Sequence, residues 1–311
     1  MRGYSIYGNV RLMTSTTQDA LAALRRSALV RDDSGPSRVY RDKEGNVYHS
    51  VTSILSATQD KSGLVHWAAG MERMYGPGAA DQERNVAAQR GTQTHDQAEY
   101  FLKTAQRLAR ATANKRNVFH WDERGLARIP SPITQWALNK VHPKIPKVSW
   151  SASGYARGLS TWIANNITEI FASEFAVSLP YGQLDGEGVL TPFTPLERKQ
   201  SPLPEGTVGF AGTADALIGI KGFEGLVMCD FKTTNRPKKL NSDHPYTHQL
   251  GAYSLALEHR TGLRPDAGLI VLAQRCGAPQ TYLINREELT NAENAYVGRV
   301  SDFYTSLGTP M

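Results

Sequence analysis

The spacing of apolar residues predicts that helices dominate the first half of the chain. Apolar positions there recur every three or four residues, which is typical of one buried helix face. This spacing predicts a helix over Ser62–Tyr75, with Ser62 as its N-cap. A longer helix is predicted over Asp81–Thr112, although Gly91 interrupts its apolar pattern, and another over Trp150–Ile167.

Beyond residue 168 the apolar period shortens to two, which is typical of strands. The first predicted strand, Glu169–Ser178, alternates with Ile170, Ala172, Phe175 and Val177 as candidate core residues. The following elements are predicted as strands over Val208–Ile220, Leu226–Phe231, Ala267–Ala273 and Thr281–Ile284, and as helices over His244–His259 and Arg286–Leu307. From Asp81 onward the main order is helix, three strands, helix, strand. This order predicts an α/β fold with a mixed sheet flanked by helices.

Turn residues and composition shifts suggest how the chain is organised. Residues 1–37 are interpreted as an N-terminal arm with a short amphipathic stretch over Asp19–Val30. Residues 38–311 are expected to form one domain that starts with a hairpin over Arg38–Tyr48. An insertion is expected at about 113–168, containing a loop region with one short helix.

Composition excludes several classes of protein. The 311 residues are 40% hydrophobic, which favours a packed core over disorder. Only Cys229 and Cys276 are present, too few for a disulfide framework, a zinc ribbon or a four-cysteine iron–sulfur cluster. No apolar run reaches the length of a membrane span. The formal charge of +6 permits a nucleic-acid partner.

The first 30 residues lack the apolar core of a secretory signal, and we expect a cytoplasmic protein from a bacterium or a phage-infected cell. The alternative is import into an organelle, because arginines precede the first acidic residue of this segment.

Two carboxylates interrupt strands that otherwise look buried. Asp215 lies within the small and apolar stretch GFAGTADALIGI, and Asp230 ends the apolar run before FKTT. Lys232 is two residues beyond Asp230, so both side chains project from the same face of a strand. Because burying a charge is costly, a divalent cation is the natural compensation for two such carboxylates. Taken alone, Asp230 and Lys232 would by default be interpreted as a surface ion pair.

A histidine on the long predicted helix adds a nitrogen ligand. His95 lies in RGTQTHDQAEYF, with Glu99 one turn later on the same face. Imidazole suits manganese better than magnesium, so the predicted site accepts either ion. Glu99 either orients His95 as a hydrogen-bond acceptor or faces solvent. A bound metal would polarise a phosphoryl oxygen and lower the pKa of a bound water. Lys232 could orient or deprotonate that water or stabilise developing negative charge.

Four motifs in order, G-T-x-x-H, G-T-x-D, D-F-K-T and Q-L-x-x-Y, resemble the RecB-like branch of the PD-(D/E)XK nucleases. The resemblance implies their restriction-endonuclease-like core, with the order αβββαβ. It implies that His95, Asp215, Asp230 and the main-chain carbonyl of Phe231 bind Mg²⁺ or Mn²⁺. It also implies that Lys232 acts at the scissile phosphate. It further implies that Gln249 and Tyr253 help to position the substrate. Glu174 would be the supporting acid that the family often has on the first core strand.

An upstream segment, YHSVTSILSATQDKSGLVHWA, resembles the start of the mitochondrial genome maintenance exonuclease group and its phage-encoded relatives. This resemblance implies a metal-dependent exonuclease on single-stranded DNA in replication, recombination or repair. Three alternatives remain: a structure-specific or double-strand nuclease on the same core, a non-catalytic DNA-binding protein, and a structural protein without metal.

Basic and aromatic residues near the motifs are candidates for DNA contact, since single strands are bound through phosphates and stacked bases. The candidates are Lys61, Trp67, Arg90, Arg236, Lys238 and Lys239. A segment from Arg116 to Arg124 also interleaves cations with aromatic residues, and its aromatic residues either stack on bases or anchor the segment to the protein core.

Overall fold

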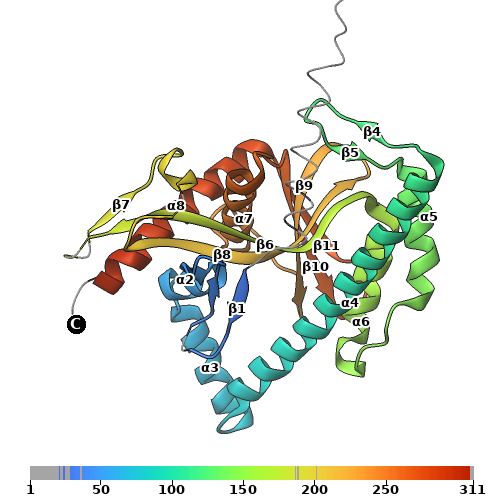
Figure 1. Cartoon of the computed structure of the whole chain (residues 1–311). Coiled ribbons are helices and arrows are strands. Elements are labelled where there is room, and N and C mark those ends of the chain that lie inside the picture. Colours follow the sequence, from blue (N-terminus) through green and yellow to red (C-terminus); the bar gives the residue numbers. More distant parts are fainter. Residues whose placement is uncertain are drawn as a thin grey trace, which may run out of the picture.

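The computed structural model describes Leu21, Leu24 and residues 29–308 except Pro36, Gly186, Gly188 and Ser201. A mixed sheet crosses the molecule, with the long helix α4 on one side of it and α7 and α8 on the other (Figure 1). The helices are α2 (Val51–Thr58), α3 (Ser62–Tyr75), α4 (Ala79–Arg116), α5 (Ser131–Val141), α6 (Trp150–Asn166), α7 (Pro245–Thr261) and α8 (Arg286–Gly308). Among the described residues, no helix is long and apolar enough to cross a membrane.

The main sheet has nine strands in the described part of the chain. They are β1 (Val30–Asp32), β2 (Val39–Arg41), β3 (Val47–Ser50), β6 (Ile167–Leu184), β7 (Leu190–Pro192), β8 (Thr207–Ile220), β9 (Phe223–Thr234), β10 (Ala267–Gln274) and β11 (Gln280–Ile284). The strand order is β1-β2-β3-β8-β9-β10-β11, and β6 pairs antiparallel with β8 along almost its whole length. Pairing of β9 with β10 is parallel, and α7 makes the crossover between them.

Side chains of the central strands alternate between two hydrophobic cores. On β9, Met228 packs in the core under α7 and α8, whereas Val227, Cys229 and Phe231 pack in the core under α4, α5 and α6. A strand buried on both faces has no solvent side, which explains the nearly continuous apolar sequence before Asp230. The predicted α/β fold and the order αβββαβ are confirmed, as α4, β6, β8, β9, α7 and β10.

The predicted insertion folds as a helical layer beside α4. It contains a two-stranded hairpin, β4 (His120–Trp121) with β5 (Ala127–Arg128), followed by α5 and α6. Its helices contribute Leu138 and Leu159 to the core that α4 covers. The insertion therefore completes one face of the sheet.

The N-terminal region adds strands to the sheet edge. The predicted hairpin over Arg38–Tyr48 is present as β2 and β3, and β1 pairs with β2 from within the segment interpreted as an arm. Leu21 and Leu24 are buried in the main core, while most of the predicted amphipathic stretch Asp19–Val30 lies outside the described residues. The proposed domain boundary at residue 37 stays a prediction.

Two local features differ from the sequence prediction. The helix α2 was not predicted; it begins where the Ser50 side chain accepts a hydrogen bond from the Ser53 N–H, as an N-cap does. The predicted N-cap role of Ser62 is wrong, because Lys61 occupies the cap position of α3. Asp60 instead accepts hydrogen bonds from the Ser62 N–H and hydroxyl, since a carboxylate accepts more readily than serine at this turn.

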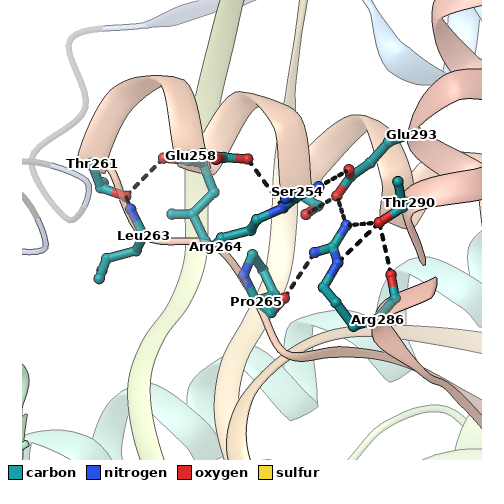
Figure 2. Close-up of polar contacts among 10 residues, drawn as sticks. Ser254, Glu258, Thr261, Leu263, Arg264, Pro265, Arg286, Thr290 and Glu293 are labelled. Carbon is teal, nitrogen blue, oxygen red and sulfur yellow. Dashed lines mark hydrogen bonds and ion pairs between the residues drawn. The ribbon is translucent and has the colours of Figure 1, made fainter. Parts of the chain in front are cut away.

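Helices α7 and α8 approach closely and are joined by a buried polar network. A Cβ atom at Gly251 of α7 would lie 2.5 Å from the backbone of Ala292 in α8, so only glycine permits this approach. Figure 2 shows Glu293 of α8, which is 3% exposed, accepting hydrogen bonds from Ser254 at 2.7 Å, from Arg264 at 3.0 Å and from Arg286. This packing fixes α7, the helix that carries Gln249 and Tyr253.

Candidate active site

The candidate site lies where β8 lacks a second neighbouring strand. On one side β8 pairs continuously with β6. On its other side it pairs with β3 at Phe210 and Ala211 and with β9 from Ala216 onward. Between these two ladders, residues 212–215 have no strand partner on that side. Asp215 lies at the end of this gap.

Asp215 replaces a missing ladder contact with its side chain. Its Oδ2 atom accepts a hydrogen bond of 2.6 Å from the backbone N–H of Phe231. The strands β8 and β9 separate just beyond Ala216 and Cys229, so this carboxylate bridges strands that no longer pair through their backbones. The carbonyl of a strand residue points to the same side as its N–H. The Phe231 carbonyl, predicted as a metal ligand, therefore faces the same gap.

Asp230 and Lys232 form a buried ion pair on the next strand. The Lys232 Nζ atom lies 2.6 Å from Oδ1 and 2.5 Å from Oδ2 of Asp230. The Asp230 side chain is 0% exposed and that of Lys232 is 19% exposed, so the surface ion pair considered from sequence alone does not describe them. The Lys232 ammonium also lies 5.4 Å from the ring centroid of Tyr246 on α7, within cation–π range.

Three other groups converge beside this pair. Ligand atoms of His95 on α4, Glu174 on β6 and Asp215 on β8 all lie within 4.8 Å of one another. His95 Nδ1 is 3.6 Å from Asp215 Oδ2. The structure thus brings the predicted His95 and Asp215 together, and it places Glu174 among the potential ligand atoms rather than behind them. The Asp230 oxygens contact Lys232 and are outside this cluster.

Glu174 reaches the cluster through an unusual backbone conformation. Its φ is 45°, in the left-handed region, although its neighbours Ser173 and Phe175 pair regularly with β8. Such a conformation costs about 1–2 kcal/mol for a residue with a Cβ. Strain of this kind is common at functional sites, where the surrounding structure fixes it. We interpret it here as the means by which an acid in the first core strand is directed towards Asp215.

Electrostatic effects in the cluster oppose one another. Burial and the neighbouring Asp215 carboxylate raise the pKa of Glu174 to about 8. Burial likewise raises the pKa of Asp230 to about 6, although Lys232 counteracts it. Burial would also raise the pKa of Asp215, but His95 and Lys232 outweigh burial and hold that pKa below its ordinary value. Three carboxylates therefore share too few cations in the metal-free protein, which favours binding of an additional positive charge.

Asp215 also changes the titration of the imidazole beside it. Burial by itself would lower the pKa of His95, yet the adjacent Asp215 carboxylate raises it above its ordinary value. Glu99 was expected either to orient His95 or to face solvent. In the structure it forms an ion pair with Lys103, one turn further along α4, at the helix surface. No hydrogen bond joins Glu99 to His95 in the described structure. Its charge still contributes to the raised pKa of Glu174.

Gln249 and Tyr253 line the gap in β8 from α7. The Gln249 Nε2 atom donates a hydrogen bond of 3.0 Å to the Tyr253 hydroxyl. The Tyr253 ring occupies the space beside Gly212, where an added Cβ would lie 2.7 Å from Cε1 of the ring. Burial raises the pKa of Tyr253 well above its ordinary value, so this hydroxyl keeps its proton. The tyrosine therefore packs on the face of β8 that α7 covers and adds a neutral polar group to the site.

A cleft of about 1140 Å³ begins directly after the Lys232 strand. Residues of α3, α4 and the segment Thr233–Lys238 line it. Four of the predicted DNA-contacting residues are part of its wall: Trp67, Arg90, Arg236 and Lys238. Lys61 and Lys239 are exposed but lie outside the lining. The cleft thus combines apolar, aromatic and cationic side chains next to the carboxylate cluster.

The sequence interpretation missed two tyrosines that contact residues of the cleft wall, Tyr155 and Tyr246. Arg90 lies 4.9 Å from the centroid of the Tyr155 ring of α6, and the Tyr155 hydroxyl donates a 2.5 Å hydrogen bond to Asn235. Tyr246 contacts the side chains of both Lys232 and Lys238. Tyr155 lies in the insertion, where no motif marks it, whereas Tyr246 is three residues before Gln249 and could have been found from that spacing.

The segment from Arg116 to Arg124 lies apart from the cleft lining. Its hairpin is tied to the protein by an ion pair of 2.8 Å between Arg124 and Asp266. Trp121 is exposed on β4, and Phe119 packs partly against the core. Phe119 therefore anchors the segment to the protein core, which is one of the two alternatives expected from sequence.

Comparisons with known proteins identify one family. The PD-(D/E)XK nuclease superfamily matches residues 66–300, most of the chain, including all elements of the candidate site. A search of solved structures finds a protein titled "Crystal structure of SSO0001", 15% identical over 63% of this chain and 73% of that one, with a TM-score of 0.25. That likeness is too low to support a functional comparison. No curated protein matches this chain.

Proposed function

This chain belongs to the PD-(D/E)XK nuclease superfamily, and from that premise we propose that it is a metal-dependent deoxyribonuclease that degrades single-stranded DNA from an end. The observation that carries the proposal is the convergence of His95, Glu174 and Asp215 beside the buried Asp230–Lys232 pair. A nuclease of this family acts on a nucleic acid. The proposal goes beyond the family in three points: the substrate is DNA, the DNA is single-stranded, and cleavage starts from an end.

The donor set fits a divalent metal ion. Two carboxylates and one imidazole lie within 4.8 Å of one another, and burial together with the neighbouring Asp215 carboxylate raises the pKa of Glu174. His95, Glu174 and Asp215 would hold the ion, and Asp230 with the Phe231 carbonyl are further expected ligands. Carboxylates suit Mg²⁺, and the imidazole favours Mn²⁺. When bound, such an ion polarises the phosphate and lowers the pKa of a bound water.

Lys232 supplies positive charge at the reacting phosphate. Both Asp230 oxygens lie within 2.6 Å of its Nζ atom, which keeps the amine protonated and directed. Of the roles considered for Lys232, we favour stabilisation of developing negative charge, because an ammonium held by two acceptors is a poor base. Gln249 and the protonated Tyr253 would orient the substrate from the α7 side.

The cleft beyond Lys232 supports a single strand as substrate. Trp67 and Tyr75 supply stacking surface, and Arg90, Arg236 and Lys238 supply contacts to phosphates. The attack from an end rests on the resemblance to exonucleases that thread one strand into such a site. Together with the resemblance to the RecB-like branch and its mitochondrial and phage exonucleases, this supports a role in phage or bacterial DNA replication, recombination or repair, in the cytoplasm.

The proposal is tested by incubating end-labelled linear single strands, linear duplexes and closed single-stranded circles with Mg²⁺ or Mn²⁺. We expect linear single strands to be degraded and circles to persist. Lys232→Ala should abolish degradation, with Lys221→Ala, a lysine in the turn that precedes β9, as the control. Rapid cutting of circles would contradict the exonuclease, and equal activity of Lys232→Ala would contradict the assigned site.

The main alternative is a structure-specific or double-strand nuclease on the same core. Preferential degradation of the duplex in this assay would favour it. A DNA-binding protein without activity is a second alternative, which would bind the substrates and cleave none of them.

A further inference from the structure

A second cavity, of about 580 Å³, lies between α6 and the loop joining β10 to β11. Its lining includes Gly154, Arg157 and Trp162 of α6 and Arg275 and Cys276 of the loop. The chemistry derived above uses none of these residues, and no motif of the sequence marks them.

The loop is held rigidly against the helix. A Cβ atom at Gly154 would lie 2.0 Å from the carbonyl oxygen of Arg275, and one at Gly158 would lie 3.1 Å from that of Gly277. Two glycines one turn apart on α6 thus allow the loop backbone to contact the helix directly. The position of Arg275 is therefore fixed by packing, and a ligand would meet a preformed surface.

The surface around this cavity presents an exposed aromatic ring and uncompensated positive charge. Trp150, at the start of α6, is 82% exposed, and the Arg275 guanidinium lies 5.5 Å from its ring centroid. Neither Arg157 nor Arg275 has a carboxylate within ion-pair distance among the described residues. Residues 131–168 contain no Asp or Glu but four cations: Lys140, Lys144, Lys147 and Arg157. This segment therefore holds most of the formal charge of +6.

This surface continues the edge of the sheet at which the candidate active site lies. In the parallel pair β9–β10, Gln274 is opposite Thr234, so Arg275 follows at the level of Asn235 in the cleft wall. The side chain of Gln280 accepts a hydrogen bond of 3.0 Å from the Lys238 N–H, which joins the two loops. On α6, Tyr155 reaches Asn235, while its neighbours Gly154 and Arg157 face the second cavity. Helix α6 thus contacts the wall of the first cleft through Tyr155 and lines the second cavity with Gly154 and Arg157.

We infer that Trp150, Arg157 and Arg275 form a second binding site for single-stranded nucleic acid, which holds the strand outside the catalytic cleft. A base stacks on the exposed Trp150 ring, and the two guanidiniums bind phosphates. The exposed Trp150 ring and the two arginines without a carboxylate partner are accessible to a ligand that carries both bases and phosphates. The inference rests on the proposed function in that the strand bound here is the nuclease substrate.

The test measures binding without cleavage in the full-length Asp215→Asn protein, with fluorescein-labelled oligothymidylate in Mg²⁺. We expect Trp150→Ala to raise the Kd of an oligomer of about 20 nucleotides by about 5-fold or more and to affect one of about 5 nucleotides less. Arg157→Ala should reduce the dependence of log Kd on log salt by about one unit. Trp136→Ala, which removes another exposed tryptophan from α5, should leave the Kd unchanged. Trp150→Tyr should restore binding.

A second measurement reports the site directly. Oligothymidylate carrying 5-iodouracil is crosslinked by light to the Asp215→Asn protein, and the modified peptide is identified by mass spectrometry. A crosslink at Trp150 supports the site. Its absence together with an unchanged Kd for Trp150→Ala overturns the inference, and so does the absence of any binding by the long oligomer. Crosslinking at Trp150 in a protein whose wild type cleaves no DNA would instead contradict the proposed nuclease activity alone.

Discussion

The Asp215 carboxylate accepts a 2.6 Å hydrogen bond from the backbone N–H of Phe231, at the point where β8 and β9 separate. One side chain thus closes the opening between two strands and faces the cluster that would bind metal. Because Phe231 lies between Asp230 and Lys232, this bond fixes the position of both groups relative to Asp215.

Removing one charge of the Asp230–Lys232 pair should destabilise the protein more than removing both charges. Lys232→Met leaves the fully buried Asp230 without a partner, and breaking a buried pair in this way costs about 3–5 kcal/mol. The double variant Asp230→Asn, Lys232→Met removes both charges and should recover a large part of that loss. Urea unfolding of both variants measures the difference. If the double variant is as unstable as Lys232→Met, the loss of stability does not come from the unpartnered charge of Asp230.

Stability of the metal-free protein should fall as the pH rises towards 8. The pKa of Glu174 is raised from 4.5 to about 8, so the folded protein retains a proton that the unfolded chain releases above pH 4.5. Its stabilising contribution is complete below pH 4.5 and is lost as the pH rises through about 8. Melting temperatures measured in EDTA should show this decline, and Glu174→Gln should flatten it. Mn²⁺ should raise the melting temperature most at the high end of this range, because it replaces the proton.

Gly212 should tolerate no side chain while Tyr253 is present. The Cβ atom of Gly212→Ala would lie 2.7 Å from the tyrosine ring, and we expect a loss of about 1–3 kcal/mol together with lower nuclease activity. Adding Tyr253→Leu should restore stability without restoring activity. Gly298→Ala is the control, since a Cβ atom on that helical glycine meets nothing within 4 Å. Additive losses in the double variant would show that the ring does not occupy this space.

Glu293 should stabilise the packing of α7 on α8. Its carboxylate is 3% exposed and accepts from Ser254, Arg264 and Arg286 (Figure 2). Glu293→Gln leaves Arg286 without its anion and Arg264 with Glu258 alone, and it should cost about 3–5 kcal/mol in unfolding free energy. Glu287→Gln, at an acid in the first turn of the same helix, is the matched control and should change stability little. An unchanged denaturation midpoint for Glu293→Gln would contradict this role.

Local sequence patterns predicted the elements of the fold because those elements follow local periodicity. The bounds of α3, α4 and β8 were reproduced closely, since alternation and helical spacing are set by neighbouring residues. The helix α2 escaped detection, because eight residues carry too short a pattern and its cap at Ser50 lies inside a strand. The apolar run before Asp230 was correctly interpreted as a buried strand.

The sequence by itself determined that acids, a histidine and a lysine lie in elements that can meet at one edge of a sheet. Only the tertiary structure decided how they are shared: Lys232 holds Asp230, whereas Glu174 joins His95 and Asp215. This division depends on strand register and on the φ of one residue, which sequence spacing does not specify. The same holds for Trp150 and Arg275, 125 positions apart, whose contact depends on the close packing of a loop on α6.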